Sequence, residues 1–399
     1  MVETVGRPPG VEPAARAGPA DQREPGGRSC VAFSGVLIDL WGTLVAPFPK
    51  REHTAALAAC FERLGIAVPA SRGAWLEGGG RRALGTDGCM AEHFGWIAQR
   101  MGVTVTTPRL AAAEEVYLQF ILERLVPLDG ALEGLVALER AGLPLAVVSN
   151  CGPDVPQVWN RTALARFFAV RAFSCELGAA KPDPAIYAHA LSALRLDPRR
   201  TLYVGDGSDG ELAGAARLGM HPVLMRVDLS NTYDPDRPDV AQWRGDGVSN
   251  PREVPALLGL RTEGMWRGSA AICVDAGRVL LVHGGDPGDD KRWGLPGGAL
   301  AEGMPQESFE ACCRREVLEE TGCAVTVGRL VRVKTHSPLL PSAFQCRIFE
   351  VRLLGGVPQP QDPDGDVDAA AWFTRDELAR LDFHFPEDRA LILEHLRSL

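Results

Sequence analysis

Lysine is scarce in this chain of 399 residues, which has only four lysines (Lys50, Lys181, Lys291 and Lys334) among 42 Lys and Arg residues. Arginine therefore supplies nearly all of the positive charge, and the chain is also rich in Ala, Gly and Pro. This bias is typical of a GC-rich bacterial genome. Because lysine is so rare here, a lysine at a motif position carries more weight than it would elsewhere.

The chain also lacks long apolar runs and closely spaced cysteines. No segment approaches the ~18 apolar residues of a membrane span, and the first residues, V-E-T-V-G-R-P-P-G, lack the apolar core of a signal peptide. None of the ten cysteines belongs to a C-x-x-C pair. These absences predict a cytoplasmic protein with reduced thiols, no membrane partner and no cysteine-bound metal.

Positive charge is in the minority, because 42 basic residues against 51 acidic ones give a net charge of −9. A protein that grips nucleic acid needs a basic face, and no helix-turn-helix pattern is evident. The composition therefore excludes nucleic acid as the main partner. Small phosphorylated substrates remain compatible with it, since a local metal ion can bind them. The oligomeric state is left open.

The patterning divides the chain into two different domains, in line with about 150 residues per domain. Residues 1–33 are rich in Pro, Gly and Arg and predict a disordered tail. Strand and helix patterns alternate over 34–260, which predicts a doubly wound parallel sheet, with mostly helical sequence over about 46–130. A linker at 261–266 precedes a domain of mixed pattern at 267–399, whose last helix is expected at 376–381.

Polar residues follow three of the predicted strands. Asp39 follows G-V-L-I, Ser149 ends P-L-A-V-V-S, and Asp206 follows T-L-Y-V-G. Ligands of parallel sheets bind beyond the carboxyl ends of the strands. A carboxylate there can attack phosphorus, a hydroxyl can bind phosphoryl oxygens, and Lys181 can neutralise charge. Acidic oxygens suit Mg²⁺.

Four motifs in order, D-L-W-G-T-L, V-V-S-N, A-A-K-P-D-P and V-G-D-G-S-D-G-E-L, resemble those of haloacid dehalogenase-like hydrolases. The resemblance covers residues 34–260 and implies a helical cap at about 46–130. It also implies phosphomonoester hydrolysis through an aspartyl-phosphate. The roles it implies are nucleophile and Mg²⁺ ligand for Asp39, phosphate binding for Thr43, Ser149 and Asn150, motif lysine for Lys181, and Mg²⁺ ligand for Asp206.

Two positions depart from that family pattern. Trp41 stands where phosphatases carry a second Asp, and a general acid at that place contributes typically 10²–10⁴ in rate. The dehalogenase branch has an aromatic residue there. Glu211 stands where Asp is more usual, and Asp209 is either a ligand or a solvated turn residue. Three hypotheses stay open: a phosphatase, a fold whose chemistry has faded, and cleavage of a carbon–halogen or similar bond.

A dense acidic cluster marks the second domain. Glu316, Glu319 and Glu320 are spaced so that all three carboxylates share one face of a helix. Their mutual repulsion is offset if a divalent cation binds, and carboxylate oxygens suit Mg²⁺ or Mn²⁺. The alternative is a solvated acidic helix face.

The surrounding sequence resembles the Nudix hydrolase signature over residues 267–399. E-x7-R-E-V-x-E-E-x-G-C runs from Glu307 to Cys323, and W-G-L-P-G-G ends at Gly298. Eight residues separate Gly298 from Glu307 where the signature has five, which predicts a loop insertion. The resemblance implies an α/β/α domain that hydrolyses a pyrophosphate bond. The implied residues are Glu316, Glu319 and Glu320 for the metal, Glu316 and Glu319 for catalysis, Gly298 and Arg315 for substrate, and Asp366 or Asp368 as a further acid.

Together the two resemblances predict a bifunctional phosphohydrolase. The Nudix half would hydrolyse a nucleoside diphosphate linked to a group X with Mg²⁺, or with Mn²⁺ in its place. The other half would remove the phosphate of a monoester, such as the product of the first step. Its partners would be small phosphorylated molecules, nucleotides above all. The alternative is a Nudix pyrophosphohydrolase whose first domain is catalytically silent and binds a ligand or regulates.

Overall fold

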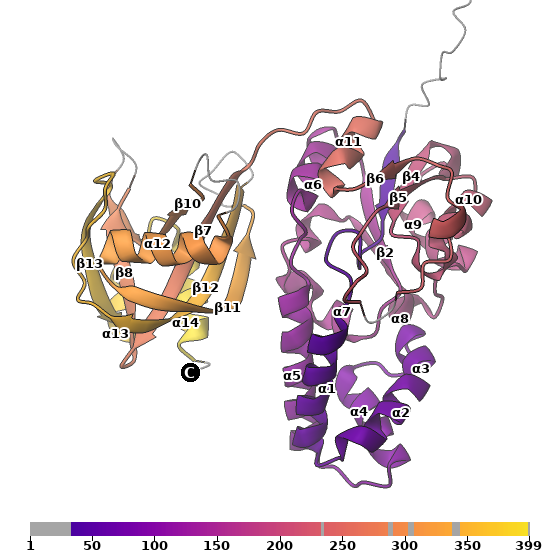
Figure 1. Cartoon of the computed structure of the whole chain (residues 1–399), viewed down its shortest axis with the longest axis horizontal. Helices are drawn as coiled ribbons and strands as arrows, with labels where there is room; N and C mark the ends of the chain where they lie inside the picture. The colour runs from indigo at the N-terminus through magenta and orange to yellow at the C-terminus, as the bar shows by residue number, and fades with distance from the viewer. Residues whose placement is uncertain (1–32, 233–234, 286–289, 302–306, 337–343, 398–399) are drawn as a thin grey trace, which may run out of the picture. The chain divides into compact units, whose positions relative to one another are not determined.

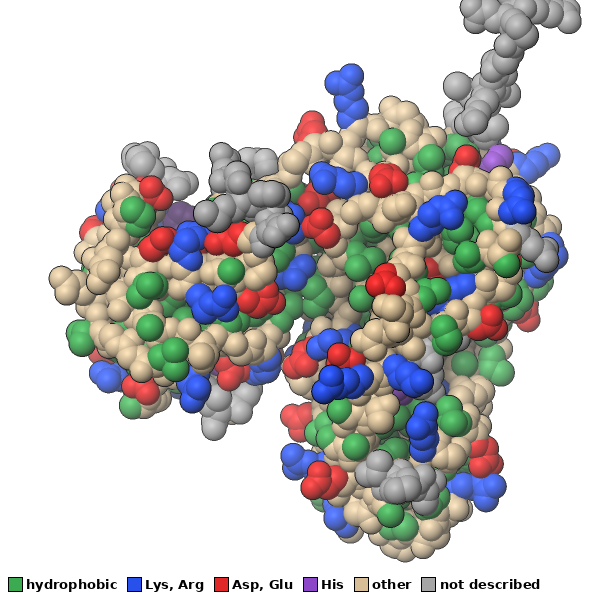
Figure 2. Space-filling model, in the orientation of Figure 1, with side chains coloured by type: hydrophobic (Ala, Val, Ile, Leu, Met, Phe, Trp, Pro, Cys, Tyr) green, Lys and Arg blue, Asp and Glu red, His purple; other side chains and the backbone are tan. Residues whose placement is uncertain are grey.

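A computed structural model describes residues 33–232, 235–285, 290–301, 307–336 and 344–397. The predicted tail, apart from residue 33, lies outside the described residues, as do residues 302–306 of the predicted insertion. Within the described ranges no helix is both long and apolar enough to cross a membrane. Basic and acidic side chains alternate over the face drawn in Figure 2, without a broad basic patch.

The first domain is built on a six-stranded parallel sheet, as predicted (Figure 1). The strand order is β3-β2-β1-β4-β5-β6, and every neighbouring pair is parallel. Strands buried on both faces need continuous apolar sequence, which V-L-I and L-A-V-V supply. The strands are β1 (Gly35–Ile38), β2 (Leu145–Ser149), β3 (Val170–Phe173), β4 (Thr201–Gly205), β5 (His221–Met225) and β6 (Gly247–Val248).

Alternate residues of β1 enter different cores, which shows that both faces of the sheet are covered. Val36 and Ile38 pack in one cluster with helix α6 (Ala131–Arg140), and Leu37 packs in the other. The second cluster includes helices α9 (Pro184–Leu194) and α10 (Glu211–Arg217). This is the doubly wound arrangement that places ligands at the carboxyl edge of the strands.

A helical cap is inserted between β1 and β2 (Figure 1). Its core is aromatic: Trp75, Phe61, Phe94 and Tyr117 are all buried. Two short helices, α7 (Asp154–Val158) and α8 (Ser174–Leu177), follow β2 and β3. The cap helices are α1 (Lys50–Leu64), α2 (Val68–Glu77), α3 (Gly79–Ala83), α4 (Met90–Arg100) and α5 (Thr107–Arg124).

The second domain has a seven-stranded mixed sheet in the order β11-β12-β7-β8-β13, with β10 beside β7 and β9 beside β8. β12 and β7 are parallel and the other pairs are antiparallel. The predicted turn at Ala276 and Gly277 is present, with positive φ at both residues. The strands are β7 (Trp266–Asp275), β8 (Arg278–Gly284), β9 (Arg292–Gly294), β10 (Gly297–Ala299), β11 (Ala324–Lys334), β12 (Phe344–Gly355) and β13 (Val367–Thr374).

Helices cover both faces of this sheet, so the predicted α/β/α class is confirmed. Helix α12 (Phe309–Thr321) packs on the face of Ala271 and Cys273, and α14 (Pro386–His395) packs on the face of Ile272. A short helix, α13 (Arg375–Leu378), precedes α14. The last helix therefore lies beyond the predicted 376–381, because the apolar residues of α14 are consecutive rather than spaced at a helical period.

Candidate active site

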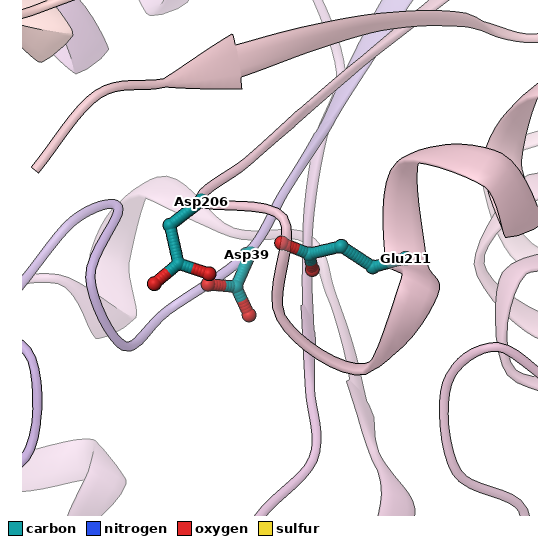
Figure 3. Close-up of side chains that lie close together, drawn as sticks. All are labelled: Asp39, Asp206 and Glu211. Atoms are coloured by element: carbon teal, nitrogen blue, oxygen red, sulfur yellow. The ribbon is translucent and has the colours of Figure 1, made fainter. Parts of the chain in front are cut away.

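Three buried carboxylates meet at the carboxyl edge of the first sheet (Figure 3). Asp39 follows β1 and its N–H donates to Val204 O of β4, while Asp206 follows β4 itself. Glu211, the first residue of α10, joins them. The ligand oxygens of the three side chains lie within 4.8 Å of one another. The strand ends predicted from sequence are thus brought together in one site.

Glycines permit this close approach. Gly42 has φ +76°, and a Cβ there would lie 2.1 Å from Asp206 Oδ2. A Cβ at Gly205 would lie 2.3 Å from Glu211 Oε1. Because Gly has no Cβ and tolerates positive φ, the turn after Asp39 can pass directly against Asp206.

Lys181, from the loop before α9, is buried between two of the carboxylates. Its Nζ lies 2.5 Å from Asp39 Oδ1 and 2.6 Å from Glu211 Oε2. Burial alone would lower the pKa of Lys181, but the two carboxylates outweigh it and raise that pKa, so the ammonium stays charged. Burial also raises the pKa of Asp39, and Lys181 opposes this shift.

Glu211 and Asp209, which the sequence could not distinguish, occupy different environments. Glu211 is fully buried and also accepts hydrogen bonds from Tyr203 Oη at 2.6 Å and from Gly207 N at 2.9 Å. Asp209 is exposed, has φ +54°, and accepts a 2.8 Å hydrogen bond from Asn150 Nδ2. The position nearest the other carboxylates is therefore that of Glu211.

The three residues predicted to bind phosphate lie around this cluster. Thr43 Oγ1 donates to Asp39 Oδ2 at 3.1 Å. Ser149 Oγ is buried and has no hydrogen-bond partner in the described part of the chain. Asn150 instead holds the loop of Lys181: its Oδ1 accepts from Lys181 N at 2.7 Å, and its Nδ2 donates to Lys181 O at 3.1 Å.

Sequence reasoning missed Arg237. Its Nε and Nη2 lie 2.8 and 2.7 Å from Asp206 Oδ2, and its side chain is only 8% exposed. Burial and the charge of Glu211 raise the pKa of Asp206 to about 6, and Arg237 opposes that rise. The P-D-R-P-D segment has no periodicity, so only its charge could have signalled a role.

A cavity of about 220 Å³ lies between this cluster and the cap. Asp39 and Lys181 line its sheet side, and Trp41 lines it where an acid would stand in the family pattern. The Trp41 ring packs edge-on against Phe48, with centroids 4.6 Å apart. The cavity is also lined by Asp154 of α7 and, on the cap side, by Phe48, His53, Trp75, Arg82 and Tyr117.

In the second domain, Arg315 lies among the predicted metal-binding glutamates. Its Nη1 is 2.6 Å from Glu316 Oε1 and 3.0 Å from Glu319 Oε2, and its Nε is 3.0 Å from Glu307 Oε1. The guanidinium offsets the repulsion between these carboxylates, a task that was expected to fall to a divalent cation. Among the described residues, only Asp39, Asp206 and Glu211 form a group of three ligands close enough to share an ion.

The Glu320 side chain makes a different contact, with the backbone of β10. Its Oε2 accepts a 2.6 Å hydrogen bond from Gly297 N of β10. Burial, and to a smaller degree the charges of Glu316 and Asp362, raise the pKa of Glu320 to about 8 against the opposing effect of that hydrogen bond. Gly298 lies beside Glu316, because a Cβ there would be 2.5 Å from Glu316 Oε2.

The acids expected outside the signature lie in two places. Asp368 Oδ1 is 2.7 Å from His283 Nδ1, and its Oδ2 is 3.4 Å from Lys291 Nζ. Asp366 N donates to Asp362 Oδ2 at 2.7 Å. Asp362 was not predicted, yet its charge acts on Glu320. The D-P-D-G-D run around it holds three aspartates, and nothing in their spacing singles out one acid.

Comparisons with known families agree with the two resemblances. The family model for haloacid dehalogenase-like hydrolases matches residues 33–219, and the NUDIX domain model matches residues 265–395.

Named relatives cover the first domain. Over 169 residues the chain is 31% identical to glyceraldehyde 3-phosphate phosphatase from Methanopyrus kandleri, covering 41% of this chain and 69% of that protein. Over 233 residues it is 28% identical to N-acetylmuramic acid 6-phosphate phosphatase from Pseudomonas aeruginosa, covering 57% of this chain and 95% of that one. The chain spans about half the length of several other curated relatives.

A solved structure of a NUDIX hydrolase from Nitrosomonas europaea matches the second domain. Its sequence identity is 24% and its TM-score 0.31, and the match covers 34% of this chain and 90% of that one.

Proposed function

Because the chain belongs to the haloacid dehalogenase-like hydrolase family and carries a NUDIX domain, it is a phosphohydrolase, and we propose that each half catalyses its own step. The second half hydrolyses the pyrophosphate bond of a nucleoside diphosphate linked to X. The first half then removes phosphate from a monoester product. The observation that carries the proposal is the buried contact of Lys181 with Asp39 beside Asp206 on a cavity.

In the first half, the side chains have distinct tasks. Asp39 attacks phosphorus with a carboxylate oxygen, forming an aspartyl-phosphate while the ester P–O bond breaks. Lys181 neutralises charge on the nucleophile and on the phosphoryl oxygens, and Ser149 Oγ donates to one of those oxygens. The leaving oxygen takes its proton from water, because the indole of Trp41 is not acidic enough to act as a general acid. A second water then hydrolyses the aspartyl-phosphate.

A divalent cation fits the carboxylate cluster. Asp39 and Asp206 offer hard oxygen ligands, and a metal ion there would bind beside their partners Lys181 and Arg237. The oxygens of Glu211 accept from Lys181, Tyr203 and Gly207. Mg²⁺ bound there would supply charge stabilisation for the transferring phosphoryl group. Mn²⁺ has the same ligand preferences.

In the second half, Glu316, Glu319 and Glu320 are the proposed ligands of a second Mg²⁺. Arg315 contacts one oxygen of Glu316 and one of Glu319, so a metal ion on this face would bind beside a protein cation. Glu316 and Glu319 have the proposed catalytic role, and Gly298 and Arg315 the proposed contact with substrate.

Fusion of the two halves supports consecutive steps. When two sites share one chain, an intermediate released by the first has a raised effective concentration at the second, provided that the linker allows both to face a shared volume. The substrates are then small phosphorylated molecules, with a nucleotide as the parent compound.

The test measures phosphate release from a panel of phosphomonoesters and nucleoside diphosphate derivatives with Mg²⁺. Wild type runs beside Asp39→Asn and Glu320→Gln, so each variant is the control for the other half. We expect Asp39→Asn to lose only monoester turnover and Glu320→Gln to lose only diphosphate cleavage. If wild type and Asp39→Asn are equally inactive on every monoester, the first half is not a phosphatase.

The second candidate is a Nudix pyrophosphohydrolase with a silent, ligand-binding first domain. Trp41 favours it, because no titratable group stands at that position, and so does Arg237, because it occupies Asp206. A monoester that raises the melting temperature without release of phosphate would support this candidate.

A further inference from the structure

Two cysteines of the first domain bring their sulfur atoms together at the edge of the candidate active site. Cys151 lies in the loop after β2, and Cys175 lies on α8. Their Sγ atoms are 4.0 Å apart, and both side chains are free thiols. The sulfurs of Cys60, Cys312 and Cys313 instead donate to backbone carbonyl oxygens. The pair is therefore a candidate for chemistry between two thiols.

Ser174 holds the backbone of Cys151 against α8. Its Oγ accepts a 3.0 Å hydrogen bond from Cys151 N and donates to Cys151 O at 3.2 Å. Ser174 is fully buried, so water does not compete for these two bonds. The loop after β2 and the start of α8 thus keep the two thiols side by side in the folded protein.

A covalent bond between these sulfurs requires a small rearrangement. The S–S bond of a disulfide is about 2.05 Å long, so the two sulfurs must approach each other by about 2 Å. A disulfide also restricts the dihedral angle about the S–S bond and the separation of the two Cβ atoms. The loop that carries Cys151 therefore has to adjust when the bond forms.

That loop is coupled to the lysine of the candidate active site. Asn150, the residue before Cys151, forms two hydrogen bonds with the backbone of Lys181, and Lys181 Nζ contacts Asp39. Cys151 itself lines the cavity. A displacement of Cys151 therefore reaches the anchor of Lys181 through one peptide bond. A misplacement of about 1 Å in an active site can cost about a hundredfold in rate.

The thiol pair also lies where the cap packs on the first domain. Gly85, which follows α3, leaves no room for a side chain, because a Cβ there would collide with Cys175 O. Beside the other thiol, a Cβ at Gly152 would lie 3.4 Å from Arg82 Cβ of α3. A bond between the two sulfurs would therefore constrain the segments on which this part of the cap packs.

We propose that Cys151 and Cys175 form a reversible disulfide when the protein meets a peroxide, and that this bond lowers phosphate release by the first half. The effect on phosphate release rests on the proposed function, whereas formation of the bond does not. The disulfide would make the first half sensitive to oxidants while the second half keeps its own site.

The reaction consumes one hydrogen peroxide for each disulfide. The sulfur of Cys175, the more exposed thiol, attacks one peroxide oxygen, so an S–O bond forms, the O–O bond breaks, and a sulfenic acid and water result. The sulfur of Cys151 then attacks the sulfenic sulfur, so the S–S bond forms, the S–O bond breaks, and a second water leaves. A dithiol reverses the reaction by exchange and is itself oxidised to a disulfide.

The experiment treats the reduced full chain with hydrogen peroxide and measures two quantities. Mass spectrometry after alkylation and proteolysis maps the cross-link. Phosphate release with Mg²⁺ is measured on a phosphomonoester that the reduced wild type hydrolyses. Wild type runs beside Cys151→Ser, Cys175→Ser and Cys89→Ser. Cys89 is the matched control, because it is a free and partly exposed cysteine of the cap, just before α4.

We expect peroxide to join Cys151 to Cys175 in wild type and in Cys89→Ser, and to lower the turnover of both proteins about tenfold. Dithiothreitol should remove the cross-link and restore turnover. In Cys151→Ser and Cys175→Ser no cross-link can form at this place. The turnover of each of these variants, compared with that of its own reduced form, should not fall on oxidation.

The two measurements separate this proposal from the proposed function. Absence of the cross-link in wild type overturns the proposal, and this result needs no variant, so it holds even if a serine variant fails to fold. A cross-link that leaves turnover unchanged, or an equal loss of turnover in Cys175→Ser, overturns the control of phosphate release. If the reduced wild type hydrolyses no phosphomonoester, the proposed function fails, and the mapped cross-link still decides whether the disulfide forms.

Discussion

Arg237 directs two nitrogens at one oxygen of Asp206: Nε lies 2.8 Å and Nη2 lies 2.7 Å from Oδ2. The contact joins residues 31 positions apart and neutralises the carboxylate proposed to bind Mg²⁺. Arg237 and the proposed metal ion would thus compete for one carboxylate.

Removing the charge of Arg237 is expected to change the stability of the fold and the affinity for Mg²⁺ in opposite directions. Without metal, Arg237→Gln is expected to lower the free energy of unfolding by about 2–4 kcal/mol, because Asp206 stays buried with a weaker partner. It is also expected to raise Mg²⁺ affinity about tenfold, measured by calorimetry. Arg244→Gln, an exposed arginine of the same loop, is the control. Unchanged Mg²⁺ affinity would contradict the competition.

A substitution at Gly42 tests the close approach of the turn after Asp39 to Asp206. Gly42→Ala and Gly142→Ala both place Ala at φ near +70°, but nothing lies within 4 Å of the new Cβ at position 142. Backbone strain alone costs about 1–2 kcal/mol, which is the loss expected for Gly142→Ala in denaturant unfolding. Gly42→Ala should lose about 1–3 kcal/mol more through the clash, and its monoester activity as well. Equal losses would show that Asp206 moves aside freely.

Asp154 gives stability a dependence on pH. Burial raises its folded pKa to about 6, above the reference value of 3.8. The contribution of the protonated carboxyl to the free energy of unfolding is therefore complete below pH 4 and is lost as the pH rises through 6. Asp154→Asn should leave stability unchanged at pH 4 and raise it by about 2–3 kcal/mol at pH 8, measured by urea unfolding. An equal gain at both values would point to packing rather than charge.

Arg315 tests charge compensation in the second domain. Arg315→Gln leaves Glu316 and Glu319 without their shared guanidinium, and the cost in a metal-free buffer should be about 1 kcal/mol, since the arginine is about one-third exposed. Added Mg²⁺ should restore the melting temperature of the variant more than that of wild type. Arg314→Gln, the exposed neighbour, is the control and should behave as wild type. A variant that Mg²⁺ does not rescue would argue against a metal on this face.

The convergence of Asp39 and Asp206 was predictable because each follows an apolar run long enough for a buried strand. Parallel strands end at one edge, so the two carboxylates had to meet there. Glu211 and Asp209 could not be separated in the same way. The choice depends on the positive φ of Asp209, which turns one carboxylate outward, and on the reach of Lys181 from a distant loop.

Other features left no mark in the sequence. Arg237 belongs to a loop without periodicity, so its contact with Asp206 depends on the tertiary structure and cannot be predicted from local sequence. The helix pattern of Glu316, Glu319 and Glu320 was correct, since all three lie on α12. Their pairing with Arg315 depends on rotamers that spacing does not determine. The roles given to these side chains stay predictions until the variants are measured.

The ring contact of Trp41 with Phe48 joins the turn that follows Asp39 to the segment that enters the cap. Phe48 in turn meets His53 and Phe120, whose rings belong to α1 and α5. Consecutive aromatic contacts therefore connect the turn after Asp39 with two cap helices. A substitution of Phe48 would thus alter the packing of the turn after Asp39 and of the cap helices together.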